Sequence, residues 1–147
     1  IKTIEVNYRY EESESFKIVV ENEMPAVYDG TGELIENANI GNAYEYLAAF
    51  RNTGYEGAIV NTDGIFAKMD SVKAAGEVYR VYVEPIKGDP IELKAYRVRA
   101  MPGTFDMNDQ PRLWDQDRLY GIINDDFYVL IQNFGMQKIT RSLSDFK

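Results

Sequence analysis

The 147-residue chain contains no cysteine and no histidine. The absence of cysteine excludes a disulfide framework, and the absence of both residues excludes a Cys/His zinc site and a haem held by histidine. A Ser-His-Asp or Cys-His nucleophile cannot be assembled from this chain alone. Acid–base catalysis would need a carboxylate, a lysine or a tyrosine with a shifted pKa. The composition therefore favours binding over catalysis.

Long apolar runs are also missing, because no stretch of the sequence approaches the ~20 residues that a membrane-spanning helix needs. The phosphate-binding patterns GxGxxG and GxxxxGKS/T and the nucleophile pattern GxSxG do not occur. We therefore predict no membrane insertion and no cofactor.

Basic residues are few, since 16 Lys+Arg stand against 24 Asp+Glu and the net charge is −8. Proteins bind nucleic-acid phosphates through Lys and Arg, so we expect no direct nucleic-acid binding. Most of the negative charge falls in residues 1–76, whereas residues 77–147 are nearly balanced. An acidic decoy that occupies a nucleic-acid-binding protein is one hypothesis that fits the first half.

Period-two alternation of apolar and polar residues dominates what is present, and it is the pattern of half-buried strands. The first 22 residues predict a β-hairpin, and residues 23–41 are expected to be irregular. In residues 91–100 the apolar phase changes, which predicts a bulge or strong bend near Ala95. Further strands are expected over residues 57–62, 65–69, 78–84, 91–100, 119–123, 127–132 and 136–143.

One helix is predicted over residues 42–53. Asn42 is expected to be the N-cap, with Glu45 three residues later completing a capping box. Gly54 stands where a left-handed residue would end the helix. These elements predict one mostly β (α+β) domain spanning residues 1–147. Its expected architecture is an antiparallel barrel or two-sheet sandwich of about nine strands with this helix docked on it.

Arginines and aromatic residues gather in the second half of the chain, and they are the candidate binding residues. If Ile86 paired with Ile91, Arg80 would face Arg97 across a hairpin, and such a pair calls for an anion between them. That anion would be a bound ligand or a structural carboxylate such as Asp115. Aromatic rings offer apolar faces to sugars and peptides. The predicted ligand-binding set is Arg80, Arg97, Arg99, Tyr82, Tyr96 and Trp114.

A metal hypothesis concerns an acidic loop, because hard cations such as Ca²⁺ prefer several oxygen ligands. The spacing of Asp106 and Asn108 matches the start of an EF-hand loop, but Pro111 stands where that loop needs glycine. A solvated loop explains the same residues without a metal. The candidate ligands are Asp106, Asn108, Asp109, Asp115 and Asp117.

The leading hypothesis is a non-catalytic binding or assembly domain: a cell-surface or exported ligand-binding module, or a subunit of a virion or appendage. Its partner would be a protein, a small molecule or a glycan, and a homo-oligomer is a further expectation. The alternative is an accessory protein that binds an anion or phosphate ligand, or a carboxylate-dependent enzyme. Because the chain starts at Ile1, we expect a processed chain, which favours an exported or surface location over the cytoplasm.

Overall fold

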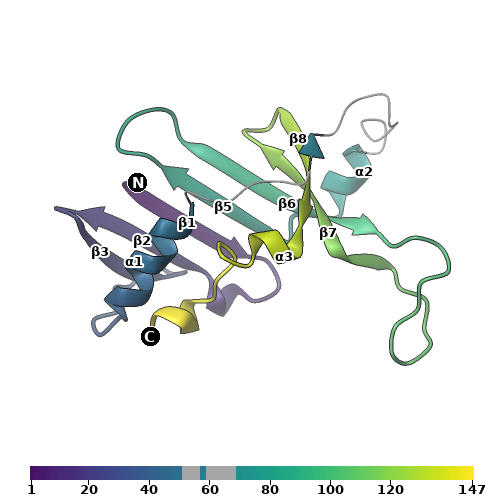
Figure 1. Cartoon of the computed structure of the whole chain (residues 1–147), viewed down its shortest axis with the longest axis horizontal. Helices are drawn as coiled ribbons and strands as arrows, with labels where there is room; N and C mark the ends of the chain where they lie inside the picture. The colour runs from purple at the N-terminus through teal and green to yellow at the C-terminus, as the bar shows by residue number, and fades with distance from the viewer. Residues whose placement is uncertain (51–56, 59–68) are drawn as a thin grey trace.

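The structure is a computed structural model, and it describes residues 1–50, 57–58 and 69–147. Within them, eight strands form a single sheet in the order β3-β2-β1-β5-β6-β7-β8-β4 (Figure 1). All neighbouring strands are antiparallel. The strands are β1 Thr3–Tyr8, β2 Phe16–Glu21, β3 Met24–Asp29, β4 Gly57–Ala58, β5 Tyr79–Glu84, β6 Ile91–Arg99, β7 Trp114–Ile123 and β8 Phe127–Gln132.

The mostly β, antiparallel architecture predicted from the sequence is confirmed, but the sheet does not close into a barrel. The sheet is open, with β3 at one edge and the two-residue β4 at the other. Pro25 lies in β3 opposite Val20, and an edge strand accepts proline because its outer side needs no ladder donor. The described residues show one sheet of eight strands, so they support neither a sandwich nor the expected nine strands.

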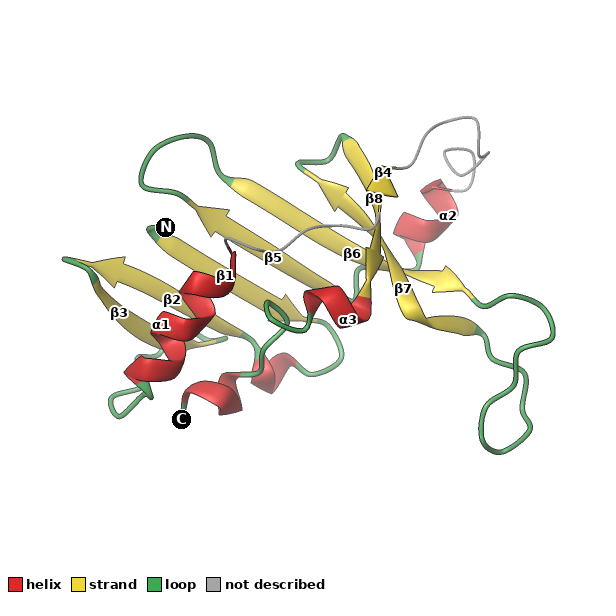
Figure 2. Cartoon of the chain, in the orientation of Figure 1, coloured by secondary structure: helices red, strands yellow, loops and turns green. Residues whose placement is uncertain are grey.

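Helices lie on both faces of this sheet (Figure 2). The first face carries the main core, in which side chains from β1, β2, β3 and β5 to β8 pack against α1 (Ile40–Ala49), α3 (Asn133–Met136) and the 3-10 turn η5 (Leu143–Phe146). Phe16, Tyr46 and Phe146 meet there with ring centroids 4.9 to 5.5 Å apart. The second face holds a smaller cluster of Met69, Tyr96 and Ile122 beneath α2 (Met69–Ala74).

The structure of β6 explains why its apolar residues change from one face of the strand to the other. Ala95 is fully buried in the main core and the next residue, Tyr96, is 7% exposed in the second cluster. Successive strand residues point to opposite faces, so both faces are covered at this position and no bulge is needed. The register shift of this strand lies further on, between Arg97 and Arg99. The predicted bend near Ala95 is therefore wrong in place and in cause.

The predicted helix exists, but it begins earlier than residue 42. Its N-cap is Asn39, whose side-chain oxygen accepts a hydrogen bond from the Asn42 N–H at 3.1 Å. Asn42 instead donates its side-chain amide to the Asp145 carbonyl at 2.8 Å. The expected end near Gly54 lies outside the described residues, as do the predicted strand over 65–69 and most of that over 57–62.

Two other predictions fail at turns. Residues 24–29 were expected to be irregular but form β3, because Asn22 and Glu23 adopt φ of 52° and 64° and make a tight hairpin turn. Residues 136–143 were expected to be a strand, but the chain there leaves α3 and runs to η5.

The hairpins β1–β2, β5–β6 and β7–β8 are confirmed. The 3-10 turn η1 (Glu12–Glu14) lies in the loop that connects β1 to β2.

Candidate functional site

The two arginines predicted to face each other lie on opposite faces of the sheet. The hairpin pairs Ile91 with Val83 rather than with Ile86, so Arg80 faces Lys94. Arg97 pairs with Leu119 of β7. The register error is three residues, and an odd error exchanges the faces of a strand. The predicted pair of Arg80 and Arg97 is therefore wrong.

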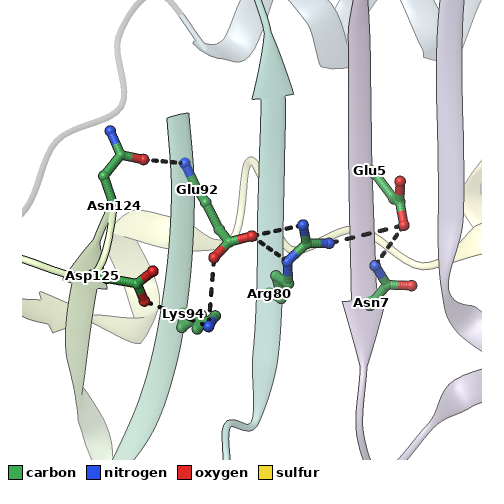
Figure 3. Close-up of polar contacts among 7 residues, drawn as sticks. All are labelled: Glu5, Asn7, Arg80, Glu92, Lys94, Asn124 and Asp125. Carbon is green, nitrogen blue, oxygen red and sulfur yellow. Dashed lines mark hydrogen bonds and ion pairs between the residues drawn. The ribbon is translucent and has the colours of Figure 1, made fainter. Parts of the chain in front are cut away.

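Arg80 is held by carboxylates of neighbouring strands, as Figure 3 shows. Its Nε and Nη2 each lie 2.6 Å from Oε2 of Glu92, and its Nη1 lies 3.9 Å from Oε1 of Glu5. Lys94 Nζ lies 3.5 Å from Glu92 Oε1 and 3.5 Å from Asp125 Oδ1. The network joins β1, β5 and β6 to the β7–β8 turn, and the structural carboxylate beside Arg80 is Glu92 rather than Asp115.

The electrostatics of this network favour its charged form. Burial lowers the pKa of Lys94, but Asp125 and Glu92 outweigh it, so the pKa lies above its ordinary value. The side chains of Arg80 and Lys94 are each 28% exposed, so solvent screens the attraction and the network contributes little stability. The network therefore gives Arg80 and Lys94 carboxylate partners from within the chain.

Tyr82 and Tyr96 share the second face with Arg80. The Arg80 guanidinium carbon lies 5.4 Å from the centroid of the Tyr82 ring. Tyr96 packs against Met69 and Ile122, and burial raises the pKa of its hydroxyl, with Glu77 adding to the effect. The structure thus separates these residues from Arg97 and Trp114 of the predicted set.

Arg97 and Trp114 do come together, and Arg97 also contacts Tyr10 on the first face of the sheet. The Arg97 guanidinium carbon lies 4.5 Å from the Tyr10 ring centroid and 5.5 Å from that of Trp114. Both distances are within the range in which a cation is attracted to an aromatic face. The β6–β7 register pairs Arg99 with Trp114, and the Arg99 guanidinium carbon lies 5.6 Å from the indole. Two guanidinium groups therefore contact a single indole.

These rings line a groove of about 500 Å³ at one end of the sheet, a volume typical of small-ligand sites. We call it the Arg97 groove. Its walls come from β1 and the loop after it, from β5, β6 and β7, from α3 and from the segment before η5. The lining residues are Tyr8, Tyr10, Glu11, Val78, Tyr79, Arg97, Trp114, Asp115, Gln116, Leu119, Asn133, Thr140 and Ser142.

Two tyrosines line the inner part of the Arg97 groove. Tyr8 and Tyr79 meet edge to face with centroids 6.2 Å apart, and the Tyr8 hydroxyl donates to the Arg141 carbonyl. The Tyr79 hydroxyl is the only buried side-chain polar atom within the described residues that lacks a hydrogen-bond partner. Burial raises the pKa of both hydroxyls, and for Tyr8 the neighbouring Tyr79 and Asp145 add to it.

The five candidate metal ligands lie on two elements. Asp115 and Asp117 belong to β7, and Asp115 Oδ1 accepts hydrogen bonds from the backbone N–H groups of Asp117 and Arg118. Asp106 Oδ1 likewise accepts from the backbone of Asn108 and Gln110, inside the long β6–β7 loop that extends from the sheet (Figure 1). Across the described ranges, no three acidic side chains gather where they could hold a metal ion.

Sequence reasoning found part of the Arg97 groove and missed the rest. Arg97, Trp114 and, as a metal candidate, Asp115 were among the predicted residues, whereas Tyr8, Tyr10 and Ser142 were not. Their assembly depends on the pairing of β1 with β5 and on the path of the C-terminal segment, neither of which leaves a local pattern. The only available signal was composition, since 11 tyrosines in one chain are many.

Comparison of the chain with protein-family models, with curated proteins and with solved structures finds no match. None of the described helices is long and apolar enough to cross a membrane. The functional argument therefore depends on the geometry and chemistry of the Arg97 groove.

Proposed function

We propose that the chain is a non-catalytic ligand-binding module and that the Arg97 groove binds a glycan. The observation that carries the proposal is the arrangement of Arg97 against Tyr10 and Trp114 at the groove. The Tyr10 side chain remains 56% exposed although the cation contacts it. Ring and guanidinium contacts of this kind orient the side chains before any ligand arrives, which lowers the entropic cost of binding.

The chemistry of the walls fits a sugar. A sugar ring has an apolar face of C–H groups, which packs on an aromatic ring, and a rim of hydroxyls that both donate and accept hydrogen bonds. The rings of Tyr10 and Trp114 offer the apolar surface. Carboxylate and amide groups of Asp115, Gln116 and Asn133 line the same groove, so acceptors and donors for hydroxyls lie beside the rings.

Fluorescence tests the proposal directly, because Trp114 is the only tryptophan of the chain. Emission excited selectively at tryptophan, which avoids the 11 tyrosines, therefore reports on the surroundings of Trp114 at the Arg97 groove. We expect soluble oligosaccharides, screened as neutral and acidic families, to include at least one that shifts this emission in a saturable way. Calorimetry should then give the same affinity. A complete screen without a saturable shift would contradict the proposal.

A matched pair of variants distinguishes groove binding from contact elsewhere. Tyr10→Ala removes a tyrosine that contacts Arg97, and Tyr82→Ala removes one that contacts Arg80 on the other face. We expect Tyr10→Ala to weaken binding by about tenfold, which corresponds to ~1.4 kcal/mol, and Tyr82→Ala to leave the affinity unchanged. Equal losses in both variants would place the ligand outside the groove.

A further inference from the structure

The cations of the two faces differ in their partners. Arg80 is bound by Glu92 and Glu5, but Arg97 makes no hydrogen bond or ion pair to any residue in the described part of the chain. Its N–H donors lie in the plane of the guanidinium, so contact with ring faces leaves them available. A partly buried arginine that is oriented by rings and has no acidic partner is suited to bidentate recognition of a carboxylate.

Two acidic residues also line the Arg97 groove. They are Glu11 and Asp115, yet no ion pair joins either of them to Arg97 within the described ranges. A bare phosphate or sulfate would be attracted by Arg97 but repelled by both carboxylates. A neutral sugar could offer hydroxyl oxygens to the Arg97 donors, but it has no anionic group, so the stronger charge-assisted, bidentate hydrogen bonds of a carboxylate would be missing. Neither kind of ligand matches all three groups.

We infer that the ligand of the Arg97 groove is an acidic sugar, whose carboxylate binds Arg97 and whose hydroxyls donate to Glu11 and Asp115. This inference rests on the proposed function, because it names the class of glycan. A sugar acid combines one anionic group with several hydroxyl donors and an apolar ring face. The groove presents a counterpart for each: a cation, two carboxylates, and the rings of Tyr10 and Trp114.

The test compares acidic sugars with their own methyl esters, which keep the shape and lose the charge. The probes are trigalacturonate and sialyllactose, each with its ester, and inorganic phosphate, all followed through Trp114 emission and calorimetry. We expect at least one acid to bind about tenfold or more tightly than its ester, and phosphate to bind more weakly than that acid. The preference for the acid over its ester should fall as the salt concentration rises.

Variants assign the preference to one side chain. Arg97→Gln is expected to abolish the difference between acid and ester, while weaker binding of both forms through the rings persists. Arg80→Gln is the matched control, since Arg80 also contacts a tyrosine ring but lies on the other face, and it should retain the preference. Circular dichroism confirms that both variants are folded.

The possible outcomes distinguish the acidic-sugar inference from the proposed glycan binding. Equal affinities for acids and esters at the groove would overturn the acidic-sugar inference and leave glycan binding standing. Phosphate that binds as tightly as either acid would replace the inference with a simple anion site. Retention of the acid preference in Arg97→Gln would also overturn it. Absence of binding by every sugar would contradict the proposed function itself.

Discussion

Tyr46 and Tyr79 are both buried in the main core. They differ in whether the side-chain hydroxyl has a hydrogen-bond partner. The Tyr46 hydroxyl donates to the Ile139 carbonyl at 2.8 Å, whereas the Tyr79 hydroxyl has no partner in the described residues. We predict that Tyr46→Phe lowers the free energy of unfolding by about 1 kcal/mol, because a buried hydrogen bond is lost. Tyr79→Phe should leave it unchanged or raise it by up to ~3 kcal/mol, because an unsatisfied polar atom is removed.

Urea denaturation of the two variants and the wild type measures this difference. Because the substitution is identical, changes in ring packing largely cancel between them. A loss in Tyr79→Phe as large as that in Tyr46→Phe would contradict the prediction.

Gly121 lies where the sheet has no room for a side chain. A Cβ at this position would lie 2.6 Å from Ile131 Cδ1 and 2.8 Å from Val129 Cγ2. We predict that Gly121→Ala lowers the free energy of unfolding by about 1–3 kcal/mol through overpacking. Gly135→Ala is the control, because nothing lies within 4 Å of a Cβ there, and it should be neutral or slightly stabilising in helix α3. Thermal unfolding of both variants tests the contrast.

At the residue scale, sequence reasoning identified side chains but not their neighbours. Arg97 and Trp114 were chosen for their chemistry, and they do meet. Arg80 was chosen for a pairing that depended on one assumed register, and the register was wrong by three residues. Charge and aromaticity are properties of single residues and can be read directly. Which carboxylate contacts which arginine depends on the turn conformations and on the pairing of strands that are distant in the chain. Neither can be read from a local sequence pattern.

The two 3-10 turns η1 and η5 are joined by one carboxylate. Glu14 accepts hydrogen bonds from the Ser144 backbone N–H at 3.0 Å and from the Ser144 hydroxyl at 2.8 Å. The backbone bond, followed by the hydroxyl bond, lowers the pKa of Glu14 below its ordinary value of 4.5. The depressed pKa means that this contribution is present above pH 4.5 and is lost as the pH falls through the folded-state pKa.

We predict that the wild type is more stable than Glu14→Gln at about pH 6 and that the difference shrinks towards about pH 3. Denaturation at a series of pH values measures it. Glu12→Gln is the control, because the Glu12 side chain makes no hydrogen bond or ion pair within the described residues, and it should track the wild type. A stability difference for Glu14→Gln that does not vary with pH would refute the assignment.

At the element scale, the strands with clear alternation were predictable and the unusual turns were not. The pattern in residues 16–21 and 127–132 matches β2 and β8 residue for residue. Strand β3 was missed because its turn uses Glu23 at a positive φ and its sequence includes Pro25. Residues 136–143 have the composition of a strand, but Met136, Ile139 and Leu143 are buried at spacings of three and four, which suits helical turns.

Two buried tyrosines, Tyr46 and Tyr79, and the partly buried Tyr8 limit the stability of the whole molecule at alkaline pH. Burial raises the pKa of Tyr8, Tyr46 and Tyr79 above the ordinary value of 10.0. In the unfolded chain these hydroxyls ionise near their ordinary pKa, while the native state keeps its protons. The contribution of these groups is therefore intact below pH 10 and falls as the pH rises above it.

We expect the chain to unfold cooperatively above about pH 10, with a step in phenolate absorbance that coincides with the loss of circular dichroism. The urea-unfolded chain is the reference and should titrate without such a step. A fold that persists while all the tyrosines ionise near pH 10 would contradict this prediction.

At the scale of the whole molecule, composition predicted a mostly β domain but not how its sheet ends. Alternation shows that strands have one buried face, and a barrel, a sandwich and an open sheet all satisfy that pattern. The decision depends on edges, here the proline-bearing β3 and the short β4. It also depends on the helices, because α1, α3 and η5 cover one face and remove the need for a second sheet there.

The pairing of β1 with β5 affects the order in which the sheet folds. It brings Thr3 against Glu84 and Tyr8 against Tyr79, whereas β1–β2–β3 and β5–β6–β7–β8 are each built from strands adjacent in sequence. Closing so long a loop is entropically slow, so we expect the two meanders to form first and their seam to limit the refolding rate. Stopped-flow refolding of Val81→Ala, at the seam, and Val129→Ala, away from it, would reveal the order. During synthesis on the ribosome, β1 emerges long before β5, and its unpaired edge is then open to mispairing and aggregation.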